Sequence, residues 1–148
     1  MKQPSVNCIN IIKKCEGLEL KPYLCPAGVP TIGYGSTRYE NGERIKLTDA
    51  PITEERANAL LLNTLKEYGD AVNSYVKVDI NQNKFDALVD FAYNAGIGSL
   101  QTSTLLKLLN KGDTYGASLE FKKWVHAGGK VLTGLVKRRK LEEELFNA

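Results

Sequence analysis

The stretch that decides the fold is CEGLELKPYLCPAGVPTIGYG, residues 15–35. Before it, apolar residues recur at helical spacing and Gly17 supplies a stop signal, so we expect a helix over residues 5–16. Within it, three prolines and several glycines surround Thr31-Ile32-Gly33-Tyr34, a short run that favours a strand. The stretch therefore predicts a helix that opens into a small sheet.

The rest of the chain predicts an α+β fold. A sheet region of two or three short strands is expected at about residues 20–50, where Asn41-Gly42 is a strong hairpin signal. From about residue 52 to residue 148 the pattern is helical. Helix-capping residues there are Thr53, Asn81, Ser103 and Asp113, and a last helix is expected at about 135–146. We expect one domain over residues 1–148, a small antiparallel sheet beside a larger helical lobe with a cleft between them.

Composition excludes several classes of protein. Of the 148 residues, 43% are hydrophobic, and the formal charge is only +3, too small to indicate a nucleic-acid binder. No run reaches the roughly 20 apolar residues of a membrane span. Cys8, Cys15 and Cys25 are an odd set, so reduced thiols are expected. The single His126 has no neighbours at metal-ligand spacing, and neither a metal nor another cofactor is expected.

Glu16 is the first candidate for chemistry, because it stands where the helix ends and the glycine-rich stretch begins. A carboxyl group partly removed from water can keep its proton and act as a general acid. A solvated residue at a helix end is the competing interpretation, and composition by itself favours it.

Several separated motifs carry a resemblance to a known family. They are Glu16-Gly17, Pro22-Tyr23, Thr31 to Gly35, Phe91 to Gly96, Ser103 to Leu106, and Trp124 with the later Gly134-Leu135 and Arg138-Arg139. In this order they resemble the phage-type lysozymes, family 24 of the glycoside hydrolases. The resemblance implies a lysozyme-like fold and hydrolysis of the β-1,4 bond between N-acetylmuramic acid and N-acetylglucosamine in peptidoglycan.

The resemblance also implies roles for three residues. Glu16 would protonate the leaving oxygen, and Thr31 would help to hold a water molecule on the opposite face of the sugar. Cys25 stands where the family has an aspartate. We expect Cys25 to orient the water in an inverting reaction, which leaves roughly 6.5–9.5 Å between the two groups. The alternatives are covalent attack by the thiolate, or an inert cysteine in a catalytically silent peptidoglycan-binding module.

Residues later in the chain receive further roles from the resemblance. Arg139, in preference to Arg138, would lie near the catalytic glutamate as electrostatic support. Tyr93, Asn94 and Ser103 stand where relatives line the sugar cleft, although core packing is an alternative for Tyr93 and helix capping for Ser103. Trp124 is interpreted as a core anchor.

The sequence also suggests the setting in which the protein works. Residues 122–140 carry seven Lys and Arg and no acidic residue, which predicts a positive patch that favours anionic surfaces. We expect peptidoglycan as the partner, with no nucleic acid and no stable membrane insertion, and a monomer. The resemblance implies host-cell lysis at the end of a phage cycle. The protein would be made in the host bacterial cytoplasm and would reach the periplasmic wall after a separate holin permeabilises the membrane.

Overall fold

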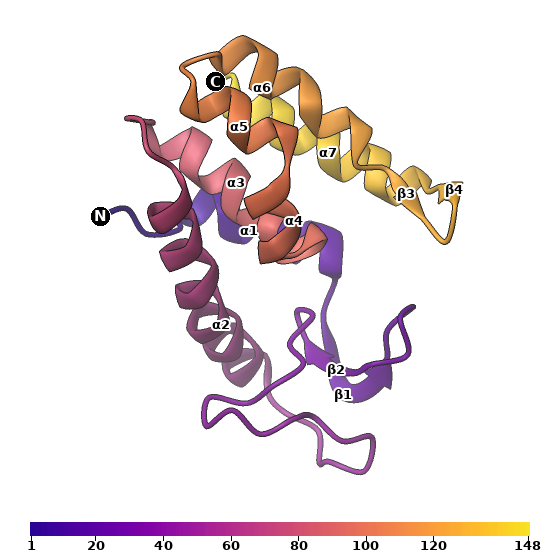
Figure 1. Cartoon of the computed structure of the whole chain (residues 1–148). Coiled ribbons are helices and arrows are strands. Elements are labelled where there is room, and N and C mark those ends of the chain that lie inside the picture. The colour runs from indigo at the N-terminus through magenta and orange to yellow at the C-terminus, as the bar shows by residue number, and fades with distance from the viewer. The chain divides into compact units, whose positions relative to one another are not determined.

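The computed structural model describes all residues, 1–148, and the chain divides into two compact units. One unit consists of residues 12–67, and the other consists of residues 1–11 and 68–148. Helix α1 (Val6–Glu16) and helix α2 (Glu54–Tyr75) each contribute residues to both units. The predicted α+β class is confirmed, because a small antiparallel sheet accompanies a mainly helical chain (Figure 1).

The sheet of the unit 12–67 forms directly after α1. Strand β1 (Glu19–Leu24) pairs antiparallel with β2 (Pro30–Gly33), with Tyr23 opposite Thr31. Gly33 ends β2 with a φ of +69°, and a side chain there would meet the Cβ of Ala57 at 3.2 Å. Glycine is therefore required at this position both by the backbone and by the close approach of α2.

The core of this unit collects side chains from the sheet, the following segment and α2. Ile32, Ile45 and Leu60 are buried together, and the partly buried Tyr39 and Ile52 pack against them. The segment between β2 and α2 forms no further strand, only two isolated bridges, between Ile32 and Ser36 and between Arg38 and Arg44. The expected turn at Asn41-Gly42 is present, with Gly42 at a φ of +88°.

Helix α2 begins as the sequence predicts. The Thr53 hydroxyl accepts a hydrogen bond from the Arg56 N–H at 3.1 Å, and Glu54 and Glu55 lie in the first turn. A side-chain cap and acidic residues at this end satisfy the exposed N–H groups and the positive end of the helix dipole.

The second unit consists mostly of helices. They are α3 (Gln82–Ala95), α4 (Ile97–Thr102), α5 (Thr104–Asn110), α6 (Thr114–Glu120) and α7 (Thr133–Phe146), with a 3-10 turn, η1 (Phe121–Lys123). Figure 1 shows α3 beside α7, and α5 beside α6. The expected caps Asn81, Ser103 and Asp113 each accept a hydrogen bond from a backbone N–H of the helix that follows.

Aromatic side chains fill the centre of this unit. Phe121 lies between Phe91 and Phe146, with ring centroids 5.8 and 5.4 Å apart and edge-to-face geometry. Trp124 packs on Phe91 at 5.3 Å, as expected of a core anchor.

Two details differ from the sequence prediction. The break at Gly128-Gly129 is the turn of a small hairpin, β3 (His126–Ala127) and β4 (Lys130–Val131), because both glycines take positive φ values of +59° and +77°. The last helix begins at Thr133 rather than near residue 135. None of the helices combines the length and the hydropathy that a membrane-spanning segment needs.

Candidate functional site

Glu16 is the last residue of α1 and is half-buried. The helix stops there because Gly17 adopts a φ of +72°, and its N–H donates to the Lys13 carbonyl at 3.0 Å. Two residues later the chain enters β1. The helix end therefore fixes the backbone from which the Glu16 side chain projects, as the sequence predicts.

Cys25 and Thr31 are joined through one backbone carbonyl. The Val29 oxygen accepts the Cys25 N–H at 3.1 Å and the Thr31 hydroxyl at 2.8 Å. The Cys25 carbonyl in turn accepts the Gly28 N–H at 2.8 Å, and Gly28 has a φ of +78°. A tight turn between β1 and β2 thus brings the half-buried cysteine and the buried threonine around the same group.

The surroundings of Cys25 favour its charged form. Hydrogen bonds lower the pKa of the Cys25 thiol, and desolvation opposes them. The Val29 N–H has the largest effect, followed by the Ala27 N–H and the Thr31 hydroxyl. The Thr31 hydroxyl has one proton, and it donates this proton in a hydrogen bond to the Val29 carbonyl. Rotation of this hydroxyl toward the sulfur would accompany formation of the thiolate, because a hydroxyl turns to suit its partner.

Tyr23 connects Glu16 with the turn. It lies opposite Thr31 in the sheet, and its pKa is raised first by burial and then by the negative charges of Glu16, Cys25 and Glu19. The charges of the Glu16 carboxylate and the Cys25 thiolate therefore both affect the pKa of the Tyr23 phenol. No sequence motif assigns Tyr23 a role of its own, and the strand register that places it opposite Thr31 identifies it.

Two candidate sugar contacts, Tyr93 and Ser103, are engaged in the helical unit. The Tyr93 ring meets Tyr68 edge-on at 5.3 Å. The Ser103 hydroxyl donates to the Leu100 carbonyl at 2.8 Å and accepts the Leu106 N–H at 3.0 Å, and only 3% of Ser103 is exposed. These contacts support the alternatives of packing for Tyr93 and helix capping for Ser103.

Arg139 and Asn94 lie together in the same unit. Arg139 Nη2 donates to Asn94 Oδ1 and to Glu142 Oε2, each at 2.8 Å, and its Nε lies 2.6 Å from Glu142 Oε1. The guanidinium also lies over the Phe91 ring at 5.0 Å. Within this unit Arg139 therefore orients Asn94 and pairs with a buried carboxylate.

Arg138 forms a second buried ion pair. Its Nη2 lies 2.7 Å from Asp90 Oδ1 and its Nε donates to Asp90 Oδ2 at 3.1 Å. Burial, followed by the adjacent Asp90, raises the pKa of Glu142 well above its usual range. Arg138 and Arg139 are only 4% and 2% exposed, so the prediction that they belong to the positive patch is wrong. Buried arginines need carboxylate partners, and α3 and α7 supply them.

No group of three or more His, Cys, Asp or Glu side chains has the arrangement of a metal site. The groups that the sheet unit offers for chemistry are thus a half-buried carboxylate at a helix end and a thiol with an adjacent hydroxyl. This arrangement suits proton transfer and the orientation of water.

Comparison with known proteins gives the class that this fold and site define. The family model for phage lysozyme matches residues 13–142, so the chain belongs to the phage lysozyme family. The endolysin of Bacillus phage B103 is 46% identical over 138 residues, which is 93% of this chain and 51% of that protein. The endolysin of Acyrthosiphon pisum secondary endosymbiont phage 1 is 43% identical over 93% of both chains.

A solved structure agrees with this assignment. A mutant of phage P22 lysozyme superposes with a TM-score of 0.87 and 36% identity, with 100% of both chains covered. The lysozyme-like fold predicted from the sequence is therefore confirmed. The chain spans about half the length of the two Bacillus phage endolysins that it matches.

Proposed function

We propose that this chain is a muramidase that hydrolyses the β-1,4 bond between N-acetylmuramic acid and N-acetylglucosamine in bacterial peptidoglycan. The observation that carries the proposal is the turn that places Cys25 and Thr31 around the Val29 carbonyl. Tyr23 lies beside this turn, and the negative charge of Glu16 raises its pKa. Membership of the phage lysozyme family supports it, as do relatives named endolysins.

Glu16 is the proton donor in this mechanism. It protonates the glycosidic oxygen as the bond to the anomeric carbon breaks and positive charge develops on the sugar. Its backbone is fixed by the end of α1, so the carboxyl group is presented from a rigid helix rather than from a loop.

Cys25 and Thr31 position the water on the opposite face. The Thr31 hydroxyl and the Cys25 sulfur act as acceptors for the water protons, and the thiolate also favours the developing positive charge. The backbone N–H groups that stabilise this thiolate allow a cysteine to serve where a carboxylate would otherwise be needed. Water attack from this side gives inversion, with an α product formed first.

Release of new reducing ends from purified cell-wall sacculi tests the proposal. Glu16→Gln should lower the rate by about 10²–10⁴-fold, the usual contribution of a general acid. Glu19→Gln is the matched control, because Glu19 is an exposed carboxylate three residues away and should leave the rate unchanged. Equal rates for the two variants would remove Glu16 from the mechanism.

The role of Cys25 separates the enzyme from a silent binding module. Cys25→Asp should retain activity and Cys25→Ser should lose most of it, because serine offers no negative charge. An initial β product would instead indicate covalent attack by sulfur. Binding to sacculi without new reducing ends in the wild-type protein would favour the silent module.

The proposal includes how the protein reaches its substrate. We expect a monomer, made in the host cytoplasm, that reaches the periplasmic wall once a separate holin has permeabilised the membrane. The three cysteines, none of them in a disulfide, suit a reducing compartment. Expression in a bacterium with and without a membrane-permeabilising protein tests this part, since lysis should require both.

A further inference from the structure

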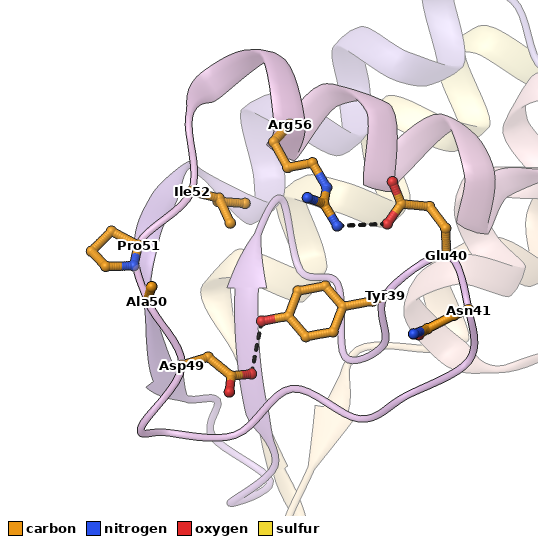
Figure 2. Close-up of a pocket in the computed structure, with 8 residues that line it drawn as sticks. All are labelled: Tyr39, Glu40, Asn41, Asp49, Ala50, Pro51, Ile52 and Arg56. Atoms are coloured by element: carbon orange, nitrogen blue, oxygen red, sulfur yellow. Dashed lines mark hydrogen bonds and ion pairs between the residues drawn. The ribbon is translucent and has the colours of Figure 1, made fainter.

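A hollow of about 610 Å³ opens on the sheet unit in the segment between β2 and α2. Its volume falls within the roughly 300–1,000 Å³ typical of ligand sites. Figure 2 shows its lining, in which the Tyr39 hydroxyl points to Asp49 and the Arg56 guanidinium points to Glu40. None of the lining residues belongs to the proposed catalytic set of Glu16, Cys25 and Thr31.

The base of the hollow is apolar and firmly held. Tyr39 and Ile52 pack against the buried core of the unit. The Tyr39 hydroxyl donates to Asp49 Oδ2 at 2.7 Å, and the Lys46 N–H donates to the same oxygen at 2.9 Å. Burial, followed by the hydrogen bond to Asp49, raises the pKa of Tyr39 to about 12, so the phenol remains a donor at neutral pH. The hollow is therefore preformed rather than assembled by a ligand.

The rim offers hydrogen-bonding groups that the protein leaves unused. Asp49 uses Oδ2 for both of its bonds, which leaves Oδ1 as an acceptor. Asn41 accepts the Glu43 N–H through Oδ1, which leaves its amide NH₂ as a donor. Arg56 and Glu40 are paired through one nitrogen and one oxygen at 2.9 Å, and each has further atoms available. Donors and acceptors thus alternate around an apolar base.

The charge of the lining narrows the class of ligand. Hydrogen bonds, with backbone N–H groups the largest cause, lower the pKa of both Glu40 and Asp49, so both are ionised at neutral pH. Two carboxylates and one guanidinium leave an excess of one negative charge. This balance disfavours phosphate and carboxylate groups, whereas an uncharged ligand with paired donors and acceptors avoids that repulsion and can replace the hydrogen bonds that the rim makes to water.

We infer that this hollow is an accessory saccharide site that holds an N-acetylated sugar of a glycan strand, apart from the residues that cleave the strand. The Arg56 guanidinium lies over the Tyr39 ring, with 5.8 Å between its Cζ and the ring centroid. The apolar face of a sugar ring would therefore lie on Ile52 and against the edge of Tyr39, and its hydroxyl and acetamido groups would bond to Asp49, Asn41 and Arg56. The inference rests on the proposed function for the identity of the polymer. A second contact with the same strand would keep the enzyme on its insoluble substrate between cleavages.

Backbone ¹H–¹⁵N spectra of the full chain during titration with N-acetylglucosamine test the site. This monosaccharide contains no bond for a muramidase to cleave, so its binding is read without turnover. We expect the amide signals of Asn41, Asp49 and Ile52 to shift and saturate. Arg56→Gln should weaken the binding about tenfold, which corresponds to about 1.4 kcal/mol. Arg44→Gln is the matched control, an exposed arginine of the same segment outside the hollow.

Three results would overturn the inference. The first is no shift at these amides, and the second is equal binding by the Arg56→Gln variant and wild type. The third is stronger binding of glucosamine or D-glutamate, because these would assign the hollow to an ammonium or a carboxylate ligand. Asp49→Asn provides a second variant, since it keeps an acceptor for Tyr39 and Lys46 but removes the charge.

A parallel assay separates this inference from the proposed function. On sacculi, the Arg56→Gln variant should show a raised KM and an unchanged kcat. Shifts at the hollow in a protein that releases no reducing ends would contradict only the muramidase proposal. Release of reducing ends without such shifts would contradict only the accessory site.

Discussion

Cys25 lies in a turn that favours negative charge, and this decides what a cysteine can do there. An ordinary thiol has a pKa of about 8.5 and is mostly neutral at pH 7. The Val29 and Ala27 N–H groups lower that pKa. The same groups would also stabilise a carboxylate at this position. The turn therefore supports either residue, and the difference between them lies in the pH range in which each is ionised.

A comparison of wild type with Cys25→Asp across pH tests this difference. The thiolate is lost as pH falls through the lowered pKa of Cys25, whereas an aspartate with an ordinary pKa of about 3.9 stays ionised. The ratio of kcat/KM for Cys25→Asp to that for wild type should therefore rise as pH falls from about 8 to about 5. A ratio that does not change with pH would show that the ionised thiol is not required.

Alkylation should divide the three cysteines by accessibility. Cys8 is fully buried, and burial raises the pKa of its thiol, so it should resist iodoacetamide in the folded protein. Cys15 is exposed and Cys25 is half-exposed, so two labels per molecule are expected by mass spectrometry. In a Cys15→Ser variant the single label should lie on Cys25 and abolish activity. Full activity of that labelled variant would contradict a role for Cys25.

Ser103 has a structural role at the start of helix α5 that explains its presence without a contact to sugar. Ser103 satisfies the Leu106 N–H at the beginning of this helix and is itself buried. Ser103→Ala should lower the free energy of unfolding by about 1 kcal/mol, the usual value of a side-chain cap. The KM for sacculi should remain unchanged.

Thr102→Ala is the control for this prediction. Thr102 is the preceding residue, it is exposed, and its hydroxyl donates only within α4, to Gly98. Chemical denaturation and rates on sacculi measure both variants. A raised KM for Ser103→Ala with unchanged stability would restore Ser103 as a sugar contact.

The elements that local signals determine were predictable, and those that depend on distant partners were not. Gly17 ends α1 and the caps Asn81 and Asp113 start their helices, because each acts on backbone groups a few residues away. The roles of Arg138 and Arg139 were not predictable in this way. A run of basic residues is typical of a solvated face, and only the packing of α7 on α3 shows that Asp90 neutralises Arg138.

The candidate site follows the same rule. The sequence identified Cys25 and Thr31 by resemblance, and the structure explains their association through the Val29 carbonyl. The hollow beside Tyr39 gave no sequence signal, because its lining comes from a hairpin turn, a loop and the first turn of a helix. Such a surface depends on tertiary packing rather than on a motif.

At the scale of the whole molecule, two buried pairs lie inside the helical unit: Arg138 with Asp90, and Arg139 with Glu142, whose pKa is raised by burial. Asp90 and Glu142 are fully buried, as are Arg138 and Arg139 to within a few per cent. Removing charged groups from water is costly, and each charge is tolerated only because its partner is present. The energetic consequence of losing one partner should therefore be far greater here than on the surface.

Asp90→Asn tests this contrast, because the amide has nearly the same shape but removes the buried negative charge that pairs with Arg138. We expect the free energy of unfolding to fall by about 3–5 kcal/mol, the usual cost of breaking a buried pair.

Glu40→Gln is the comparison on the surface. It breaks the pair between Glu40 and Arg56, whose side chains are 42% and 48% exposed respectively, and it should lower the free energy of unfolding by no more than about 1 kcal/mol. Urea denaturation at low and high salt measures both. Salt should reduce the small effect at Glu40 but not the large one at Asp90, because buried pairs are poorly screened. Equal costs for the two variants would contradict the contrast between the buried pair and the exposed one.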